Sequence, residues 1–240
     1  MNSIIITGAS RGIGRAAALL LSKEYDYLAI AGRNSALLED TAELVRANGA
    51  ICHTFCGDVS DYAFSEAMTS SVLSEAGHID ALINNAGISM VGLFTDMTPD
   101  QWHKILDVNL TSMYNTCHNA VPAMVQRKSG RIINISSVWG LTGASCEVAY
   151  SATKSAINGF TKALAKELAP SHIAVNAIAF GAVDTDMNSH LNAEDKSMLE
   201  DDIPYGKMAT PEEAAICIKN ILSMPEYMTG DVIKFDGGWV

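Results

Sequence analysis

Short, wholly apolar runs alternate along the chain with longer segments whose apolar residues recur every three or four positions. The short runs are typical of parallel β-strands covered on both faces, and the longer segments have the period of amphipathic helices. The pattern predicts six helices between seven strands, which fall at residues 3–6, 27–31, 51–56, 79–83, 131–135, 173–179 and 231–235. This alternation predicts the α/β class: a single-domain, doubly wound (Rossmann-type) seven-stranded parallel sheet with helices on both faces, spanning residues 1–240.

Capping residues mark where two of the helices begin. Thr98 and Gln101 have the spacing of a capping box around a proline, so a long helix is predicted over residues 99–126. Thr210 opens a second such box before the last long helix. Asn109 falls inside the first of these helices, where its side chain competes for backbone hydrogen bonds. An asparagine in that place therefore indicates a requirement other than helix formation.

Composition narrows the range of functions. Of the 240 residues, 48% are hydrophobic, and the net charge is −11 without any block of lysine or arginine. The apolar content suffices for one large core, and the charge argues against nucleic acid and membrane surfaces as partners. No apolar run is long enough to cross a bilayer, and the first strand begins too early for a secretory leader. We therefore expect a cytoplasmic protein.

Cysteine usage agrees with that expectation. The chain has five cysteines, an odd number without a repeated pair motif, which fits reduced thiols. Cys52, His53 and Cys56 could suggest a metal, but no second pair of ligands follows and the segment is predicted to be a buried strand. No metal site is expected.

The first strand leads into a glycine cluster, TGASRGIG at residues 7–14, which opens a helix. A strand, a glycine-rich turn and a helix in this order predict a phosphate site at the N-terminus of the helix. Gly8 allows the tight turn, Gly12 lets the backbone approach a pyrophosphate, and Gly14 permits close packing of the helix. A plain flexible turn is the alternative interpretation.

The end of the second strand bears on the choice of dinucleotide. Gly32 and Arg33 stand where an acidic residue would bind a free ribose 2′-hydroxyl, so they leave room for a 2′-phosphate and offer it a guanidinium. Arg11 could add a second positive charge. The pattern favours NADP(H) over NAD(H), unless both arginines are solvated surface charges.

Polar and small residues also follow the third and fourth strands. Asp58, followed by Val59, could bind the amine of an adenine or cap the helix that starts near residue 61. The run 84–87, Asn-Asn-Ala-Gly, has small and amide side chains that allow the backbone to lie flat against a ligand, although a simple turn would use the same residues.

Tyr150 and Lys154 carry the clearest chemistry. Residues four apart on a helix share one face, and a cation about 5 Å from a phenol is expected to lower its pKa by about two units. Tyr150 would then serve as a general acid and base. One such pair can arise by chance, but no other tyrosine has a lysine at that offset. Moreover, Ser136 and Ser137 end the preceding strand, where a hydroxyl can hold a substrate oxygen.

Together these motifs resemble the short-chain dehydrogenase/reductase family from Thr7 to residues 236–239. The resemblance implies a catalytic tetrad of Asn109, Ser137, Tyr150 and Lys154. It also implies cofactor contacts from Gly8, Ser10, Arg11, Gly12, Ile13, Gly14, Arg33, Asp58, Val59, Asn85, Ala86, Gly87, Tyr150, Lys154, Val183 and Thr185.

The implied reaction is hydride transfer from a nicotinamide to a carbonyl carbon. Ser137 would hydrogen-bond the carbonyl oxygen and Tyr150 would protonate the developing alkoxide. Lys154 would bind the nicotinamide ribose and lower the pKa of the tyrosine, with Asn109 supporting a water relay behind it. Within the family, the chain is most similar to 3-oxoacyl-[acyl-carrier-protein] reductases, which implies an NADPH-dependent reduction of 3-oxoacyl thioesters. Another NADP(H)-dependent ketone or alcohol dehydrogenase and a non-catalytic nucleotide-binding protein are the alternatives.

The resemblance also implies a homotetramer and a possible acyl carrier protein partner. Assembly would use the long helix at residue 99, the C-terminal strand and the Tyr150 helix, whose apolar stripe is Ala156, Ile157, Phe160, Ala163, Leu164 and Leu168. An acidic carrier would meet basic residues near the mouth of the active site. Lys128 with Arg127 fits one such position, but Ser171 followed by His172 occupies the other. We therefore expect weak dependence on the carrier.

The sequence leaves the roles of two segments after the sixth strand undecided. The family usually has proline-glycine there, and this chain has Phe180 and Gly181; Phe180 could pack on the nicotinamide or turn into the core. Residues 186–207 have mixed charge and weak periodicity, which favours a mobile lid over the substrate.

Overall fold

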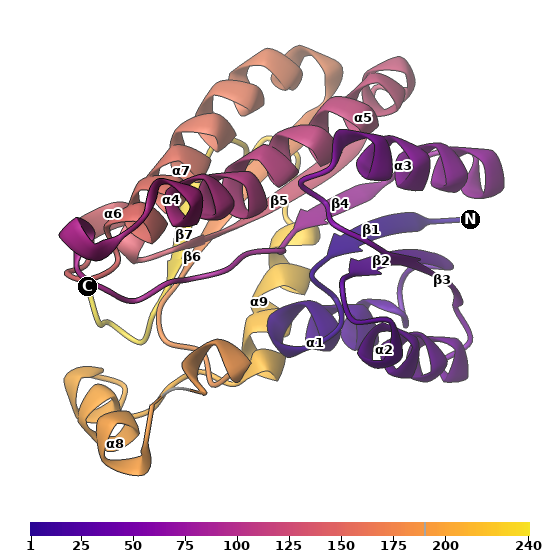
Figure 1. Cartoon of the computed structure of the whole chain (residues 1–240). Helices are drawn as coiled ribbons and strands as arrows, with labels where there is room; N and C mark the ends of the chain where they lie inside the picture. The colour runs from indigo at the N-terminus through magenta and orange to yellow at the C-terminus, as the bar shows by residue number, and fades with distance from the viewer. Residues whose placement is uncertain (190) are drawn as a thin grey trace.

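A computed structural model of the chain describes residues 1–189 and 191–240. Within them, seven parallel strands form one sheet in the order β3-β2-β1-β4-β5-β6-β7, which confirms the predicted fold (Figure 1). Their bounds are β1 Ser3–Thr7, β2 Tyr27–Gly32, β3 Ile51–Cys56, β4 Ala81–Asn84, β5 Gly130–Ser137, β6 Ile173–Phe180 and β7 Val232–Phe235. The strand order reverses between β1 and β4, and a doubly wound sheet binds its ligands outside the carboxyl ends of the strands at that point.

Helices cover both faces of the sheet. One layer consists of α1 (Gly12–Leu21), α2 (Ser35–Ala47) and α9 (Pro211–Leu222), and the other of α3 (Tyr62–Ala76), α5 (Ser112–Arg127) and α7 (Val148–Leu168). Short helices α4 (Pro99–Leu106), α6 (Trp139–Thr142) and α8 (Ala193–Asp202) lie towards the carboxyl ends of the strands. No described helix is long and apolar enough to cross a membrane.

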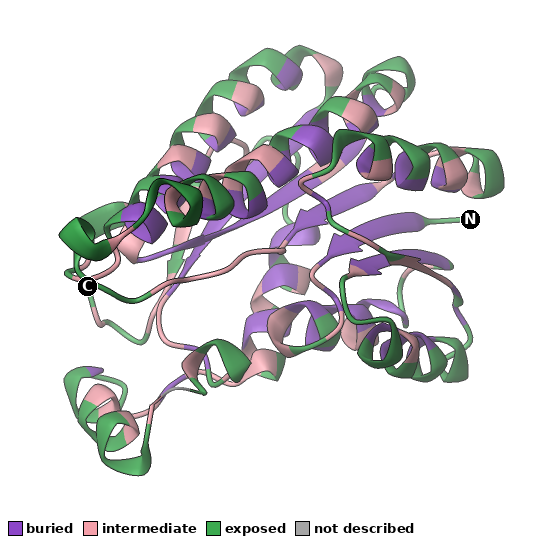
Figure 2. Ribbon diagram, viewed as in Figure 1, coloured by how far each residue is buried: buried purple, intermediate pink, exposed green. Residues whose placement is uncertain are grey.

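Alternation along the strands divides the core into two clusters. Ile4 and Ile6 of β1 pack with the layer of α1 and α9, whereas Ile5 packs with the layer of α3 and α7. Because a strand points successive side chains to opposite faces, a wholly apolar strand must be buried on both. The central strands meet this condition, as the purple centre of Figure 2 shows.

Strand β3 does not meet that condition, although residues 51–56 were predicted to be buried. It lies at the outer edge of the sheet, and of its residues only Cys52 is buried, while Ile51 and Cys56 are exposed. The order of strands in the sheet decides this exposure, and a local apolar run does not reveal that order.

The long helix predicted over residues 99–126 is interrupted. Its predicted capping box at Thr98 is present, but between α4 and α5 the residues Asp107–Thr111 form a π-helical turn. Such turns widen a helix by one residue and often occur at functional sites. Asn109, the unfavourable helix residue in the sequence, lies within this turn.

Candidate active site

The predicted phosphate site is a tightly packed turn between β1 and α1. A Cβ atom on Gly14 would lie 2.3 Å from the backbone oxygen of Gly8, so only glycine allows this approach of helix and turn. Gly12 has φ +55° and faces Thr185, whose Cγ2 would lie 3.2 Å from an added Cβ. Ser10 and Ile13 are half-buried within the same turn.

The N-terminus of α1 has the properties of an anion site. Arg11 is the N-cap residue, and its side chain makes no capping hydrogen bond; the first turn of the helix carries no acidic residue. The first amide groups of the helix are therefore available to a negative group. These residues fit the pyrophosphate of a dinucleotide.

The loop after β4 is tied directly to this turn. Thr7 Oγ1 accepts hydrogen bonds from the amides of Asn85 and Ala86, both at 3.0 Å, and Asn85 Nδ2 donates to the carbonyl oxygens of Thr7 and Gly8 at 3.0 and 3.1 Å. The side-chain amide of Asn85 thus joins the two loops. Ala86 lies beside Gly8 of the glycine turn, whereas Gly87 faces Asn109 and Lys154.

Asn109 holds the other end of that loop. Its Nδ2 donates to the carbonyl oxygen of Ile88 at 2.9 Å and to Thr153 Oγ1 at 3.1 Å, while its Oδ1 accepts from the amide of Ile88 at 2.8 Å. Thr153 in turn donates to the carbonyl oxygen of Tyr150 at 2.8 Å. The π-helical turn therefore supplies an amide that connects the β4 loop to α7, which is the requirement that the sequence left unnamed.

The remaining predicted catalytic residues meet where β5 ends and α7 begins. Ser137, Tyr150 and Lys154 are all buried, and Lys154 Nζ lies 5.4 Å from the centroid of the Tyr150 ring. The ammonium group donates to the carbonyl oxygen of Ile135 at 2.8 Å. Ser136 Oγ donates to the carbonyl oxygen of Lys154 at 3.2 Å, and Ser137 Oγ accepts a hydrogen bond from the backbone amide of Trp139 at 3.2 Å.

The predicted fall in the pKa of Tyr150 is wrong for this structure. Burial raises the pKa of the phenol above its ordinary value of 10.0; the hydrogen bond with Ser137 lowers it and the charge of Glu147 raises it. Burial also lowers the pKa of Lys154 to about 8, which reduces the positive charge that the sequence argument relied upon. Desolvation outweighs attraction because both groups are shielded from water.

Glu147 was missed in the sequence. It lies three residues before Tyr150, and residues at this spacing face the same side of a helix. Its carboxylate accepts a hydrogen bond from the hydroxyl of Ser89, in the β4 loop. Its contact with Ser89 joins residues distant in sequence, so the spacing could only have suggested it.

The two arginines predicted to read a 2′-phosphate have different surroundings. Arg33 is exposed immediately after β2, and its charge contributes to a lowered pKa of Asp58. Arg11 forms an exposed ion pair with Asp186, with 3.3 Å between Nη1 and Oδ2. Both side chains are exposed, and Arg11 must leave Asp186 before it can bind another group.

Asp58 does not cap the following helix. It accepts hydrogen bonds from the amide and the hydroxyl of Ser60 at 2.9 and 2.8 Å, and the N-cap residue of α3 is Asp61. Although burial raises the pKa of Asp58, these hydrogen bonds bring it below its ordinary value. Val59 is buried under the same turn.

The segment after β6 lies against the glycine turn. Val183 is buried and forms an isolated parallel bridge with Ala209, and Thr185 reaches Gly12. Phe180 turns into the core, where its ring packs edge-on against Phe235 with centroids 5.5 Å apart. The question that the sequence left open about Phe180 is thereby answered.

The predicted lid, residues 186–207, contains a short 3₁₀ turn (Asp186–Asn188) and α8; residue 190 lies outside the described residues. Helix α8 stands away from the sheet in Figure 1. An ion pair of 3.0 Å between Lys196 and Asp184 connects it to the end of β6. Helix α8 is thus joined to the segment whose Thr185 faces Gly12 of the glycine turn, and the lid itself stays a prediction.

The predicted carrier anchors lie elsewhere. Lys128 precedes β5 and His172 precedes β6, whereas Ser137 ends β5, so one strand of about 25 Å separates the two ends. Arg127 is paired with Asp80 at the same distal end. The expectation that these residues border the mouth of the active site of their own chain is wrong. All strands of a parallel sheet begin at one edge, and the active site lies at the opposite edge, where the strands end.

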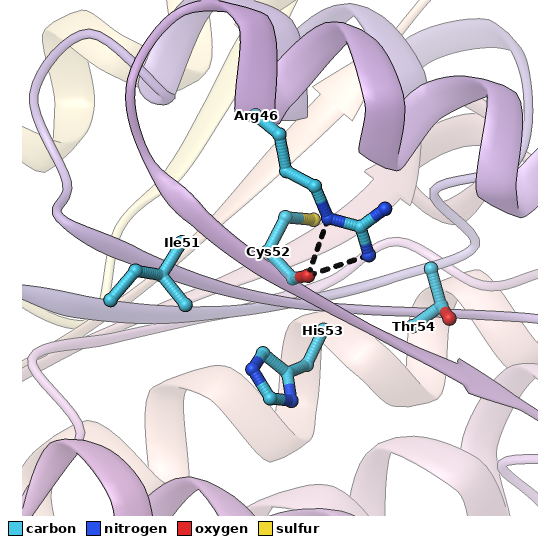
Figure 3. A pocket seen from close by; sticks show the side chains of 5 residues that line it. All are labelled: Arg46, Ile51, Cys52, His53 and Thr54. Carbon is cyan, nitrogen blue, oxygen red and sulfur yellow. Dashed lines mark hydrogen bonds between the residues drawn. The ribbon is translucent and has the colours of Figure 1, made fainter.

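A hollow on the outer edge of the sheet is unrelated to this chemistry. It is lined by Arg46, Ile51, Cys52, His53 and Thr54 (Figure 3). Arg46 donates from Nε and Nη2 to the carbonyl oxygen of Cys52 at 3.1 and 2.9 Å and so satisfies an edge carbonyl. Among the described residues, no group of three or more His, Cys, Asp or Glu side chains could hold a metal ion.

Comparison with known proteins agrees with this geometry. The family model for short chain dehydrogenase matches residues 2–196. An uncharacterized oxidoreductase, YmfI, of Bacillus subtilis is 39% identical over 238 residues, which are 98% of this chain and 97% of that protein. The 3-oxoacyl-[acyl-carrier-protein] reductase FabG of Aquifex aeolicus is 39% identical over 241 residues, covering 98% and 95%.

A solved structure gives the same result. The crystal structure of 3-oxoacyl-[acyl-carrier protein] reductase from Brucella melitensis superposes with a TM-score of 0.92 at 35% identity, covering 100% of this chain and 91% of that one. The match extends over the whole sheet and both helical layers. The chain therefore belongs to the short-chain dehydrogenase family of oxidoreductases.

Proposed function

We propose that the protein uses NADPH to reduce the 3-oxo group of an acyl thioester to a secondary alcohol. The observation that carries the proposal is the buried group of Ser137, Tyr150 and Lys154, placed one loop away from the glycine turn. Relatives described as 3-oxoacyl-[acyl-carrier-protein] reductases at 35–39% identity support the substrate class.

The residues of this chain have distinct parts in the reaction. A bound nicotinamide cofactor would supply the hydride. Ser137 donates a hydrogen bond to the carbonyl oxygen and keeps its proton. Tyr150 transfers a proton to the same oxygen as negative charge develops on it. The phenol of Tyr150 carries its proton at neutral pH, since the ordinary pKa of a tyrosine is about 10, and so it can act as the acid in the direction of reduction. Lys154 and Asn109 hold the surrounding loop and helix in place.

The choice of NADP(H) depends on Arg33. Its exposed guanidinium follows β2 at the position where the fold meets the adenosine ribose, and guanidinium groups bind phosphate in a fixed geometry. Arg11 can add to this site once it leaves Asp186. Helix α1 provides the amides for the pyrophosphate, and residues 186–207 form a lid above the substrate.

Carrier protein contributes less to binding than the acyl chain. The net charge of −11 opposes an acidic carrier, and the two candidate anchors lie at the far edge of the chain's own sheet. Steady-state rates on matched carrier-protein and coenzyme A thioesters, with NADPH and NADH at two ionic strengths, test this. Activity on both thioesters is expected. A ketone or alcohol reaction without any thioester activity would instead support a different dehydrogenase.

The protein works as a homotetramer in a reducing compartment such as the cytoplasm. All five cysteines are free, which fits that compartment.

Most of the apolar stripe of α7 is used within the chain, since Ile157, Phe160, Leu164 and Leu168 pack on the sheet. Exposed Tyr114 and Val125 on α5 and Val148 on α7 remain for a partner subunit. A monomer in light scattering at micromolar concentration would reject the tetramer.

A further inference from the structure

The residues after β7 form a fixed turn. Asp236 Oδ1 accepts from the amide of Gly238 and Oδ2 from the amide of Val240, both at 3.0 Å. The carboxylate is nearly buried, with 5% of its side chain exposed. Although burial raises its pKa, these hydrogen bonds bring the pKa of Asp236 below its ordinary value, so the group stays ionised. The turn is thus held from within.

This turn is also held from outside by the segment that follows α8. The amide of Tyr205 donates to the carbonyl oxygen of Gly237 at 3.1 Å. A Cβ atom on Gly237 would lie 2.9 Å from Ile203 Cγ2 and from Tyr205 Cβ, so the two segments are in direct contact. The path of residues 236–240 is therefore fixed on this side.

On its other side the turn presents Trp239 to α6. The ring centroids of Trp239 and Trp139 lie 4.8 Å apart with 58° between the planes, within the range of a favourable aromatic pair. Figure 1 shows the C-terminus beside α6. Both indoles are half-buried, and the contact joins residues one hundred positions apart.

Trp139 in turn contacts the predicted catalytic serine. Its backbone amide donates to Ser137 Oγ at 3.2 Å. This bond occupies one acceptor position of the hydroxyl, and the hydroxyl keeps its hydrogen as a donor. The intervening amide, that of Val138, donates to the carbonyl oxygen of Phe180 at 2.9 Å, so rotation of the segment is restricted at that end. On the other side of Trp139, the carbonyl oxygen of Gly140 accepts from Ser155 Oγ and Asn158 Nδ2 at 2.9 and 3.0 Å, and the indole of Trp139 adds a contact with the C-terminal turn.

We propose that Trp239 is a positioning residue for Ser137: by fixing the indole of Trp139, it holds the Trp139 amide in the orientation that directs the serine hydroxyl to the substrate oxygen. The inference rests on the proposed role of Ser137. Trp239 touches no reacting atom and acts only through Trp139. Its removal should therefore lower kcat and leave the binding of the cofactor unchanged.

The first test uses light absorption by the indoles. The chain has three tryptophans, and Trp102 lies on α4, so Trp102→Phe leaves only Trp139 and Trp239. The far-ultraviolet circular dichroism of this variant should show the exciton couplet of two indoles in contact. Trp239→Ala should abolish the couplet. Absence of the couplet in Trp102→Phe would overturn the proposal.

The second test is a double-mutant cycle on acetoacetyl-coenzyme A with NADPH. Trp239→Ala should lower kcat about 10- to 100-fold, as expected of a small displacement of a catalytic group. The KM of the thioester and the dissociation constant of NADPH should not change, and Trp239→Phe should restore most of the rate. In a Ser137→Ala background, Trp239→Ala should have no further effect. An unchanged kcat, or an equal fall in both backgrounds, would overturn the proposal.

A parallel assay separates this inference from the proposed function. If the unmodified protein reduces ethyl acetoacetate but not the thioester, the thioester assignment is rejected and the cycle is carried out on the ester with the same expected results. If it reduces neither probe, both proposals are rejected, since Ser137 then has no carbonyl reaction to serve. The Trp102→Phe variant should match the unmodified protein on either probe.

Discussion

The glycine turn at residues 7–14 and the turn at residues 236–240 flank the same end of the sheet but are built differently. The first is shaped by backbone: Gly14 is required by the carbonyl of Gly8, and the side-chain amide of Asn85 donates to the main-chain oxygens of Thr7 and Gly8. The second is shaped by side chains, through Asp236 and Trp239. A site made by backbone leaves its mark on consecutive residues, whereas a site made by side chains is distributed over the chain.

The largest effect is expected at Tyr150 of α7, whose role, like that of Asp236 and Trp239, depends on its side chain. Tyr150→Phe removes the transferable proton and keeps the ring, so turnover should fall by about 10²- to 10⁴-fold. The affinity for NADPH should be retained, as measured by its fluorescence. Tyr227→Phe, at a fully exposed tyrosine with 98% exposure, is the matched control and should have the normal rate. Near-normal turnover by Tyr150→Phe would show that another group is the acid.

The choice between NADPH and NADH tests whether Arg33, which follows β2, binds the 2′-phosphate. Arg33→Ala should weaken NADPH binding by about 1.5–3 kcal/mol, the value of a charge-assisted contact, and NADH binding much less. Arg11→Ala should act in the same direction and more weakly, because Arg11 is paired with Asp186. Dissociation constants for both cofactors provide the measurement. Equal losses for NADPH and NADH would mean that neither guanidinium reads the 2′-phosphate.

The substitution Gly14→Ala tests the close approach of backbone in the glycine turn. The new Cβ would lie 2.3 Å from the carbonyl oxygen of Gly8, so helix and turn must separate. We expect a loss of stability of about 1–3 kcal/mol in denaturant unfolding, together with weaker cofactor binding. Gly92→Ala is the control, since nothing lies within 4 Å of its added Cβ. Tolerance of both substitutions alike would contradict the close approach.

The last prediction concerns how the cost of burying Lys154 changes with pH. Its pKa falls from 10.5 to about 8 in the folded protein, so the charged form is disfavoured by folding. This cost is complete below about pH 8 and disappears as the pH rises to 10.5, where the unfolded chain also loses its proton. In thermal unfolding, Tm of Lys154→Met minus Tm of the unmodified protein should therefore be greatest at neutral pH and decline above pH 8. A Tm difference that does not change with pH would show that burial of the charged Lys154 amine does not destabilise the folded protein.

Features that depend on neighbouring residues could be predicted from the sequence, whereas features that depend on distant residues could not. The strands, the glycine turn and the pairing of Tyr150 with Lys154 depend on neighbours within one turn or strand, and all could be located. The sign of the shift in the Tyr150 pKa could not, because it depends on burial by residues that are distant in sequence. The distal position of Lys128 could have been inferred, since all strands of a parallel sheet start at the same edge.

Other features depend on the order of the strands. The exposure of residues 51–56 follows from the place of β3 at the edge, which no local pattern encodes. The direction of Phe180 follows from its neighbour Phe235 on β7, fifty-five positions later. The contact of Trp139 with Trp239 is of the same kind. In each case the decisive partner is brought close only by the folded sheet.

The π-helical turn at Asp107–Thr111 has a consequence for insertions and deletions. A π turn contains one residue more than the α-helical turn it replaces. Deleting one residue there would convert it to an ordinary turn and leave the faces of α4 and α5 in their present register, whereas a deletion elsewhere in α5 would rotate all that follows by about 100°. Asn109 would lose its place beside Ile88, but the sheet would keep its covering helices. This stretch is therefore where the length of the chain can change with loss of the site and little damage to the fold.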